Sequence, residues 1–226
     1  MKKVQELIHK SARKLKLDKV QATIILCGLY ILFSLTANIA ATKVTYFGKF
    51  IMDAGFIYAL TFTWRDLIHK QLGRKAAITT IYIAGIINVI AALYFQLVVV
   101  LPAETSWAAA GGQTAWAFLF GIQLRIVIGS VLAQIIAELA DTQTYQIWTY
   151  GIGKGKPQWL RVVVSNSISI PIDSIIFPII AFAGIVSADA IWQMFWTNII
   201  VKAIMTALSF WMIYLVPEKP IYTEEE

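Results

Sequence analysis

Two long stretches of this chain, residues 20–41 and 76–101, contain no charged side chain. A helix needs about 20 mostly apolar residues to cross a bilayer core about 30 Å thick, and both stretches are long enough. Only 14% of the 226 residues are charged and 58% are hydrophobic, whereas about a quarter of an ordinary soluble domain is charged. The sequence therefore predicts an all-α, polytopic membrane protein.

Six apolar segments are expected to cross the membrane as a bundle of transmembrane helices. They lie at about 20–41, 50–67, 76–101, 116–140, 160–186 and 190–215. In the second segment, only eleven uncharged residues separate Asp53 from Arg65. Because so short a run cannot span the bilayer alone, we expect this helix to be tilted within the bundle or partly broken. Residues 1–226 are predicted to form one integral membrane domain.

The distribution of basic residues predicts the orientation of the chain. Of the 19 Lys and Arg residues, seven lie in 1–19, and the predicted loops and the tail 218–226 on the same side bring the total to fifteen. The opposite side has two, Lys43 and Lys49. Because Lys and Arg favour cytoplasmic loops, both termini are expected in the cytoplasm. Residues 1–19 are then either a basic leader or a helix on an anionic leaflet. The net charge of +6 reflects membrane topology, and no nucleic-acid partner is expected.

Polar residues gather on one face of three predicted helices. At about 100° per residue, each set occupies a sector of about 80–100° around its helix axis. The sets are Gln123, Ser130, Gln134, Glu138 and Asp141; Ser165, Asn166, Ser169 and Asp173; and Asn198, Lys202, Thr206 and Ser209. Three such stripes can converge on one polar cavity. Polar groups of this kind also serve simply to tie helices together, at about 0.6 kcal/mol each.

Asp173 is the strongest single indication of a functional cavity. It lies about 20 Å deeper than Trp159 along a helix that rises about 1.5 Å per residue. A carboxylate at that depth is costly and needs a partner. Lys202 and the N–H donors of a solute are the two candidates, and the sequence favours the solute because three other polar groups share the face of Asp173. Arg125 points away from the stripe of its own helix, which predicts a structural role.

The sequence predicts no metal, cofactor or internal disulfide. Cys27 is the only cysteine, and His9 and His69 are the only histidines. Neither a thiol cluster nor a zinc-ligand spacing is therefore present.

The stretches Tyr58–Ala77, Arg125–Tyr145 and Trp159–Phe177 carry a resemblance to a known family. In order and spacing they are similar to the motifs L-T-F-x-x-x-D-x-x-x-E-x-x-G-x-x-x-A, R-x-x-x-x-S…Q-x-x-D and W-x-R-N-N-x-S…D-[TS]-x-x-F. These motifs belong to the queuosine-precursor transporters, which are vitamin-uptake-transporter-like membrane proteins. The matching residues are Asp66, Gly73, Arg125, Ser130, Asp141, Arg161, Ser165 and Asp173. The chain departs from the motifs at Lys70, Glu138, Val162, Val163 and Ile170.

The resemblance implies a transporter that imports a 7-deazaguanine precursor of queuosine, or a related purine-like solute, across the cell inner membrane. A guanine-like edge offers adjacent N–H donors, which a carboxylate accepts two at a time. The candidate substrate-binding residues are Gln134, Glu138, Asp141, Ser165, Asn166, Ser169, Asp173, Phe177 and Lys202. The candidate structural residues are Asp66, Arg125 and Arg161. No ATP-binding motif is present, which favours facilitated or ion-coupled transport.

Three other functions stay open to different degrees. The substrate-binding membrane subunit of an energy-coupling-factor vitamin importer has a similar size and is the main alternative. An intramembrane enzyme is disfavoured, because Asp141 and Asp173 could form an acid pair but the chain lacks G-x-G-D, H-E-x-x-H and a Ser–His pair within a span. A membrane scaffold without transport is the third. The expected partners are a small-molecule solute and the lipid bilayer, and the sequence leaves open whether the protein forms a homodimer.

Overall fold

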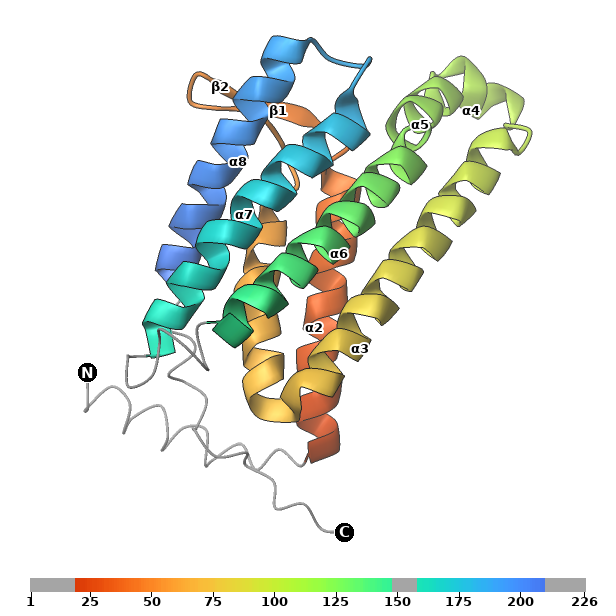
Figure 1. Ribbon diagram of the computed structural model, residues 1–226. Helices are drawn as coiled ribbons and strands as arrows, with labels where there is room; N and C mark the ends of the chain where they lie inside the picture. The colour runs from red at the N-terminus through yellow and green to blue at the C-terminus, as the bar shows by residue number, and fades with distance from the viewer. Residues whose placement is uncertain (1–18, 148–157, 210–226) are drawn as a thin grey trace.

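The computed structural model describes residues 19–147 and 158–209 and is mostly helical (Figure 1). Its elements are α2 (Lys19–Ala40), β1 (Val44–Phe47), β2 (Phe50–Asp53), the 3₁₀-helix η1 (Phe56–Tyr58), α3 (Ala59–Val100), α4 (Thr105–Ala109), α5 (Gly112–Phe120), α6 (Gln123–Ile147), α7 (Gln158–Phe182) and α8 (Ala188–Ser209). The side chains of some residues within these helices also lie outside the described part. They include Asp66, Glu138, Asp141, Arg161 and Ser165.

Within the described residues, three helical stretches are long and apolar enough to cross a membrane: Val20–Ala40, Lys75–Val100 and Gly112–Ala137. A shorter apolar helix covers Asn166–Phe182. Large apolar side chains remain uncovered along the second stretch, where Ile86 is 58% exposed. Lipid accommodates such a surface, whereas water does not. The chain is therefore a mostly helical membrane protein, and its first and third predicted spans lie where they were expected.

The predicted helix at 50–67 is wrong in its first part, where the structure has a β-hairpin. β1 and β2 pair antiparallel, with Phe47 opposite Phe50, so the turn between them has only two residues. Gly48 in this turn has φ 62°, a conformation that two-residue hairpin turns require and glycine adopts freely. The apolar composition of β2 also fits the start of a membrane helix, which explains the error. Because α3 begins only at Ala59, Asp53 lies at the end of a strand.

The rest of the segment 50–67 and the predicted helix 76–101 are two parts of α3, separated by a break at Gly73. Gly73 has φ 86° and ψ 168°, a region of backbone conformation that is essentially restricted to glycine. Figure 1 shows the first part of α3 descending close to α2 and the second part rising again after the bend. A single glycine therefore reverses the course of the chain without a loop.

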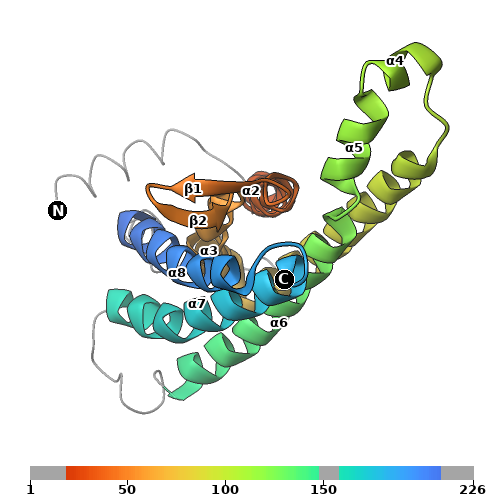
Figure 2. The same cartoon turned by 90° about the horizontal axis from the view of Figure 1, so that it is seen from above.

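The predicted external segment 102–115 contains α4 and the start of α5, and the predicted helix 116–140 is divided into α5 and α6. At the division, Gln96 of α3 donates to the carbonyl groups of Phe120 (2.8 Å) and Gly121 (3.0 Å). Carbonyl groups at a helix end lack intrahelical donors, so this side chain stabilises the interruption. Figure 2 shows α4 and α5 at a distance from the hairpin and α8.

Helices α6, α7 and α8 lie side by side and form one wall of the interior (Figure 2). The close approach of α6 to α7 depends on Gly129, where a Cβ would lie 3.3 Å from the backbone nitrogen of Ala181. A buried apolar cluster joins these helices to the end of α2. Its members are Ala41, Ile126, Ala133, Phe177, Ala181, Phe182 and Met194. This packing fixes the positions of the polar stripes that face the interior.

Candidate functional site

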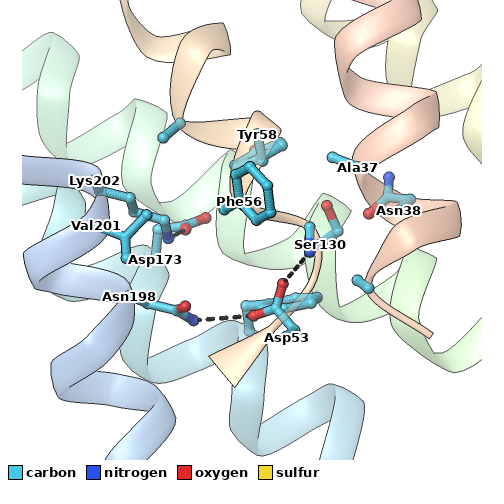
Figure 3. Close-up of a pocket in the computed structure, with 14 residues that line it drawn as sticks. Ala37, Asn38, Asp53, Phe56, Tyr58, Ser130, Asp173, Asn198, Val201 and Lys202 are labelled. Carbon is cyan, nitrogen blue, oxygen red and sulfur yellow. Dashed lines mark hydrogen bonds and ion pairs between the residues drawn. The ribbon is translucent and has the colours of Figure 1, made fainter. Parts of the chain in front are cut away.

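A polar cavity lies between α2, α6, α7, α8 and the segment that leads from β2 into α3 (Figure 3). It contains about 450 Å³ of space not filled by atoms, part of which is open to the outside. Apolar and aromatic side chains line it together with polar ones. The polar lining residues are Asn38, Asp53, Ser130, Asp173, Asn198 and Lys202. Two acids and one base therefore face the same space inside a membrane protein.

Asp173 and Lys202 form an ion pair between α7 and α8. The Lys202 ammonium group donates to Asp173 Oδ2 and, at 3.2 Å, to Ser174 Oγ. It also lies 6.0 Å from the ring centroid of Tyr58 and 5.9 Å from that of Phe62, within the range of cation–π attraction. Both charged residues are buried. Lys202 is thus the partner of Asp173 in this structure, whereas the sequence favoured a solute in that place.

Asp53 is the second acid of the cavity, and sequence reasoning missed it. Its Oδ1 accepts the backbone N–H of Gly55 (2.9 Å), and its Oδ2 accepts Asn198 Nδ2 (3.3 Å). The residue is only 6% exposed. In the sequence, Asp53 marks only the limit of the uncharged run inside the predicted helix 50–67, and it is not among the predicted site residues. The available signal was an acid at the end of an apolar run with a glycine two residues later.

Burial of the Asp53 carboxyl group is opposed by one nearby positive charge and by hydrogen bonds. Asp53 belongs to the hairpin and lies outside the membrane-spanning helices. Burial raises the pKa of its carboxyl group, while the positive charge of Lys202 and the hydrogen bonds from Gly55 and Asn198 act in the opposite direction. In the described part of the chain, no Lys or Arg forms an ion pair with Asp53. The nearby charge of Lys202 and the neutral hydrogen-bond donors therefore compensate the burial of ionised Asp53 only in part.

The turn after β2 holds Asp53 against the end of α2. A Cβ at Gly55 would lie 2.8 Å from the carbonyl oxygen of Ala37 and 2.8 Å from Asp53 Oδ1, so no side chain fits there. The turn continues into η1, where the N–H of Tyr58 donates to Gly55 O at 2.9 Å. The absence of a side chain at Gly55 lets the backbone N–H reach the Asp53 carboxylate.

A second, smaller cavity of about 260 Å³ lies on the other side of Asp173. Tyr58 and Asp173 line both cavities, whereas Arg65 and Gln134 line only the second. Gln134 donates to the hydroxyl group of Tyr30 at 2.6 Å. Arg65 marks the side of the bundle that the distribution of basic residues predicts to be cytoplasmic. Asp173 and Tyr58 therefore separate a cavity near the hairpin from a cavity toward the predicted cytoplasmic side.

The structure brings together only part of the predicted substrate-binding set. Members of that set that line one or other cavity are Gln134, Asp173, Phe177 and Lys202. Asn166 and Ser169 are buried on α7 but do not line these two cavities. Glu138, Asp141 and Ser165, together with the predicted structural residues Asp66 and Arg161, have side chains outside the described part.

Arg125 lies away from the cavity, at the end of α7. It donates from Nε to the carbonyl oxygen of Ile180 (2.7 Å) and from its terminal nitrogen to that of Ala183 (2.6 Å). The last carbonyl groups of a helix need such outside donors. The guanidinium group therefore ties the start of α6 to the end of α7.

The described residues offer hydrogen bonding, charge and aromatic surface, and they offer no metal site. Among the side chains that the structure describes, no group of three or more His, Cys, Asp or Glu lies together. Phe56, Tyr58 and Phe177 add aromatic rings to the lining of the first cavity. An arrangement of acids, amides and rings of this kind can bind a flat, polar heterocycle.

Similarity to known proteins agrees with this chemistry. Residues 53–216 match the family described as "Putative vitamin uptake transporter". The chain is 26% identical to the "Probable queuosine precursor transporter" of Bacillus subtilis (strain 168) over 174 residues, which cover 76% of this chain and 75% of that protein. No solved structure matches the chain. The two matches confirm the resemblance that the three sequence stretches predicted.

Proposed function

Because the chain belongs to the vitamin uptake transporter family, we propose that it imports a queuosine precursor, a base of the 7-deazaguanine type, or a related purine-like solute. The relative in Bacillus subtilis carries the name of a queuosine precursor transporter. Membrane transport follows from the family, and a transport role requires no catalytic residues. The nature of the solute is the proposal, and it depends on the chemistry of the cavity.

The observation that carries the proposal is the acid-lined cavity enclosed by membrane helices. A 7-deazaguanine-type base has adjacent N–H donors along one edge and two flat faces. Carboxylates accept such donors in pairs, and Asp53 and Asp173 both face the cavity. Phe56, Tyr58 and Phe177 provide rings that can pack against the faces of the base. Acid and aromatic groups together fit a purine-like base better than an apolar vitamin.

The second cavity supports transport rather than binding alone. A carrier exposes its binding site to each side of the membrane in turn. In this structure Asp173 and Tyr58 stand between the two cavities, and the ion pair with Lys202 holds α7 to α8 at the same level. Both cavities are narrow, so a base enters only when the helices separate. Because the Asp173–Lys202 pair joins α7 to α8, separation of these two helices would break it.

We propose that residues 1–226 form one transport domain with six membrane spans and with both termini in the cytoplasm. The spans correspond to α2, the two parts of α3, α5 with α6, α7 and α8. A reporter fused after Glu226 should report the cytoplasm, and a reporter within residues 102–115 should report the outside. If both report the same compartment, the six-span arrangement is wrong.

A ligand screen tests the proposed function directly. The purified protein is heated with 7-deazaguanine, queuine, guanine and a panel of vitamins, and its melting temperature Tm is recorded. A solute at a hundred times its Kd stabilises the folded state by about 2.7 kcal/mol, so a 7-deazaguanine should raise Tm more than a vitamin does. Uptake of the labelled base into proteoliposomes completes the test. Absence of both binding and uptake of every 7-deazaguanine contradicts the proposal. Co-purification of an essential ATPase subunit would favour the energy-coupling-factor alternative.

A further inference from the structure

We propose that Asp53 is the carboxylate that recognises the paired N–H donors of the solute, with Asn198 as its neighbouring hydrogen-bonding group. This inference rests on the proposed function and assigns the recognition edge within the same cavity. It replaces the assignment of that role to Asp173, which the sequence favoured. The two acids differ in the groups that already bind them in the protein without solute.

Asp173 is already neutralised. Its Oδ2 accepts the Lys202 ammonium group, which also donates to Ser174. For a neutral base to replace that ammonium group, its N–H donors would have to outweigh a buried ion pair. Loss of the pair would leave Lys202 as a buried charge without a partner, which is strongly unfavourable. Asp173 is therefore a poor first choice for a neutral heterocycle.

Asp53 has unused capacity to accept hydrogen bonds. A carboxylate offers about four acceptor positions, and Asp53 uses one for Gly55 and one for Asn198. The bond from Asn198 is long, at 3.3 Å. Burial of the Asp53 carboxylate is costly even with the charge of Lys202 nearby, since burial still raises its pKa, so additional donors brought by a solute are favourable. A solute that donates N–H groups to Asp53 should therefore bind favourably in this cavity.

The position of Asp53 suits recognition because the surrounding backbone fixes it. The residue ends β2, where it is opposite Val44 in the strand pair. The tight turn at Gly55 presses against Ala37 of α2, and Asn198 reaches the carboxylate from α8. Figure 3 shows Asp53 and Asn198 beside the same space as Phe56 and Tyr58. A base that lies against these rings could direct one edge toward Asp53.

The carboxylate of Asp53 favours the edge of the base that carries two adjacent N–H donors. A guanine-type base has a ring N–H next to an exocyclic amino group, and both can donate to one carboxylate. A hypoxanthine-type base keeps the ring N–H but lacks the amino group. A site built to accept a donor discriminates strongly against an analogue that lacks it, because the buried acceptor is then left without a partner. Asp53 should therefore give the protein its preference for amino-bearing bases.

The competing explanation is that Asp53 only ties the hairpin to α8. In that case, Asp53→Asn and Asn198→Ala should have the same effects, since each removes the same tie. If Asp53 recognises the solute, the two variants should differ. Asp53→Asn should fold, because an amide oxygen can still accept the N–H of Gly55 and the amide of Asn198 can rotate to complement it.

The experiment measures the Kd of 7-deazaguanine and of 7-deazahypoxanthine for the full-length protein in detergent. The wild type should prefer 7-deazaguanine at least about tenfold. Asp53→Asn should abolish that preference by weakening 7-deazaguanine binding more than 7-deazahypoxanthine binding, since the two bases share the ring N–H and differ in the amino group. Asn198→Ala should weaken the binding of both bases and keep the preference, because Asn198 holds Asp53 in place and the carboxylate that accepts the amino group remains. The matched control is Asp189→Asn, the same change at an exposed acid of α8, and it should behave as the wild type does.

The outcomes distinguish a failure of the proposed function from a failure of the role assigned to Asp53. A wild type that binds neither base contradicts the proposed function. A wild type that binds 7-deazaguanine while Asp53→Asn keeps the full preference contradicts this inference alone. If Asp53→Asn yields no folded protein, Asp53→Glu takes its place, because it retains the charge. That variant should still prefer 7-deazaguanine with a weaker Kd, and equal binding of the two bases by Asp53→Glu overturns the inference.

Discussion

The two buried acids of the cavity have their charges balanced in different ways. Asp173 forms an ion pair with Lys202 across α7 and α8, whereas Asp53 forms no ion pair among the described residues and accepts the N–H donors of Gly55 and Asn198, with the charge of Lys202 also acting on it. Loss of one member of a buried ion pair leaves the other charge uncompensated, whereas Asp53 has no paired cation to lose. The comparison teaches that the acid with a complete partner holds the bundle together and the acid with an incomplete one is available to a guest.

Removal of one member of the ion pair should give the largest effect. Lys202→Met leaves Asp173 buried without a cation, so the free energy of unfolding should fall by about 3–5 kcal/mol. Chemical denaturation of the purified protein in detergent measures this loss. Asp173→Asn should lower the stability for the same reason, because it leaves Lys202 uncompensated.

The double variant Asp173→Asn/Lys202→Met is the control for this prediction. It removes both charges, so much of the stability lost in either single variant should return. If the two losses simply add, Asp173 and Lys202 do not stabilise each other, and the contrast with Asp53 disappears.

Crowding of the turn beside Asp53 should give the next largest effect. Gly55→Ala places a Cβ 2.8 Å from the carbonyl oxygen of Ala37, and backbone there must move. Overpacking of this kind costs about 1–3 kcal/mol, and the displaced Asp53 should bind solute less tightly. Thermal unfolding and the Kd for 7-deazaguanine measure the two consequences.

Gly85→Ala is the matched control, because a Cβ at Gly85 of α3 meets only Val131 at an ordinary 3.8 Å. It should leave solute binding unchanged and leave stability equal or slightly higher, since alanine favours a helix over glycine. Equal effects of the two substitutions would show that the turn at Gly55 has no special part in holding Asp53.

Neutralisation of Asp53 in the protein without solute should raise the stability, by less than the preceding substitutions lower it. The ordinary pKa of an aspartate is 3.8 and burial raises that of Asp53. An acid whose pKa is raised by folding favours the folded state most below its unfolded pKa, and this contribution is lost as the pH rises through the folded pKa. The stability of the wild type should therefore fall above pH 3.8 through this group, with Lys202 and Asp173 as neighbouring charges.

Asp53→Asn removes this titration, so its Tm in the absence of solute should equal or exceed that of the wild type, and the difference should grow with pH. Melting curves of both proteins across that pH range measure the trend. If the Tm of Asp53→Asn drops as far as that of Lys202→Met, Asp53 stabilises the folded protein as Asp173 does, and the contrast between the two acids is wrong.

The smallest effect is expected at Glu104, which has donors like those of Asp53 but no burial. Its side chain accepts the backbone N–H groups of Ser106 (2.9 Å) and Trp107 (2.8 Å) at the start of α4. These bonds and the Ser106 hydroxyl lower the pKa of Glu104 to about 2 from its ordinary value of 4.5. The stability that this gives is present above pH 4.5 and is lost as the pH falls toward 2.

Glu104→Gln should therefore lower Tm slightly at neutral pH, and the difference from the wild type should vanish as the pH falls toward the lowered pKa. Solute binding should not change, because no residue of α4 lines either cavity and α4 lies at a distance from the hairpin and α8 (Figure 2). A loss of binding in Glu104→Gln would mean that acids outside the cavity also contribute to recognition.

Local patterns account for the parts of the site that were predicted correctly. The helical period places Gln134, Asp173 and Lys202 on polar faces, and these three residues do line the cavities. The same pattern offered two partners for Asp173 and favoured the solute over Lys202, because the pairing with Lys202 depends on how α7 and α8 are placed side by side. The structure decides that choice through the ion pair.

The hairpin shows where local patterns mislead. The residues of β2, Phe50–Asp53, were predicted to begin a membrane helix, and they form a strand because Gly48 permits a two-residue turn that pairs them with β1. The predicted helix made Asp53 only the limit of an uncharged run. Its bond to Asn198 joins residues 145 positions apart, and no short-range period reports a contact of that length.

The sequence by itself determined that this chain is a helical membrane protein, that it resembles the vitamin uptake transporters and that polar stripes face its interior, because length, composition and helical period are local properties. Only the tertiary structure decided which buried acid has a cation. The Asp173–Lys202 pair depends on how α8 packs against α7, and the Asp53–Asn198 contact joins α8 to β2 across 145 positions of the chain. The free energy of a buried charge is set by the groups that surround it in space, and the packing of separate elements brings those groups together.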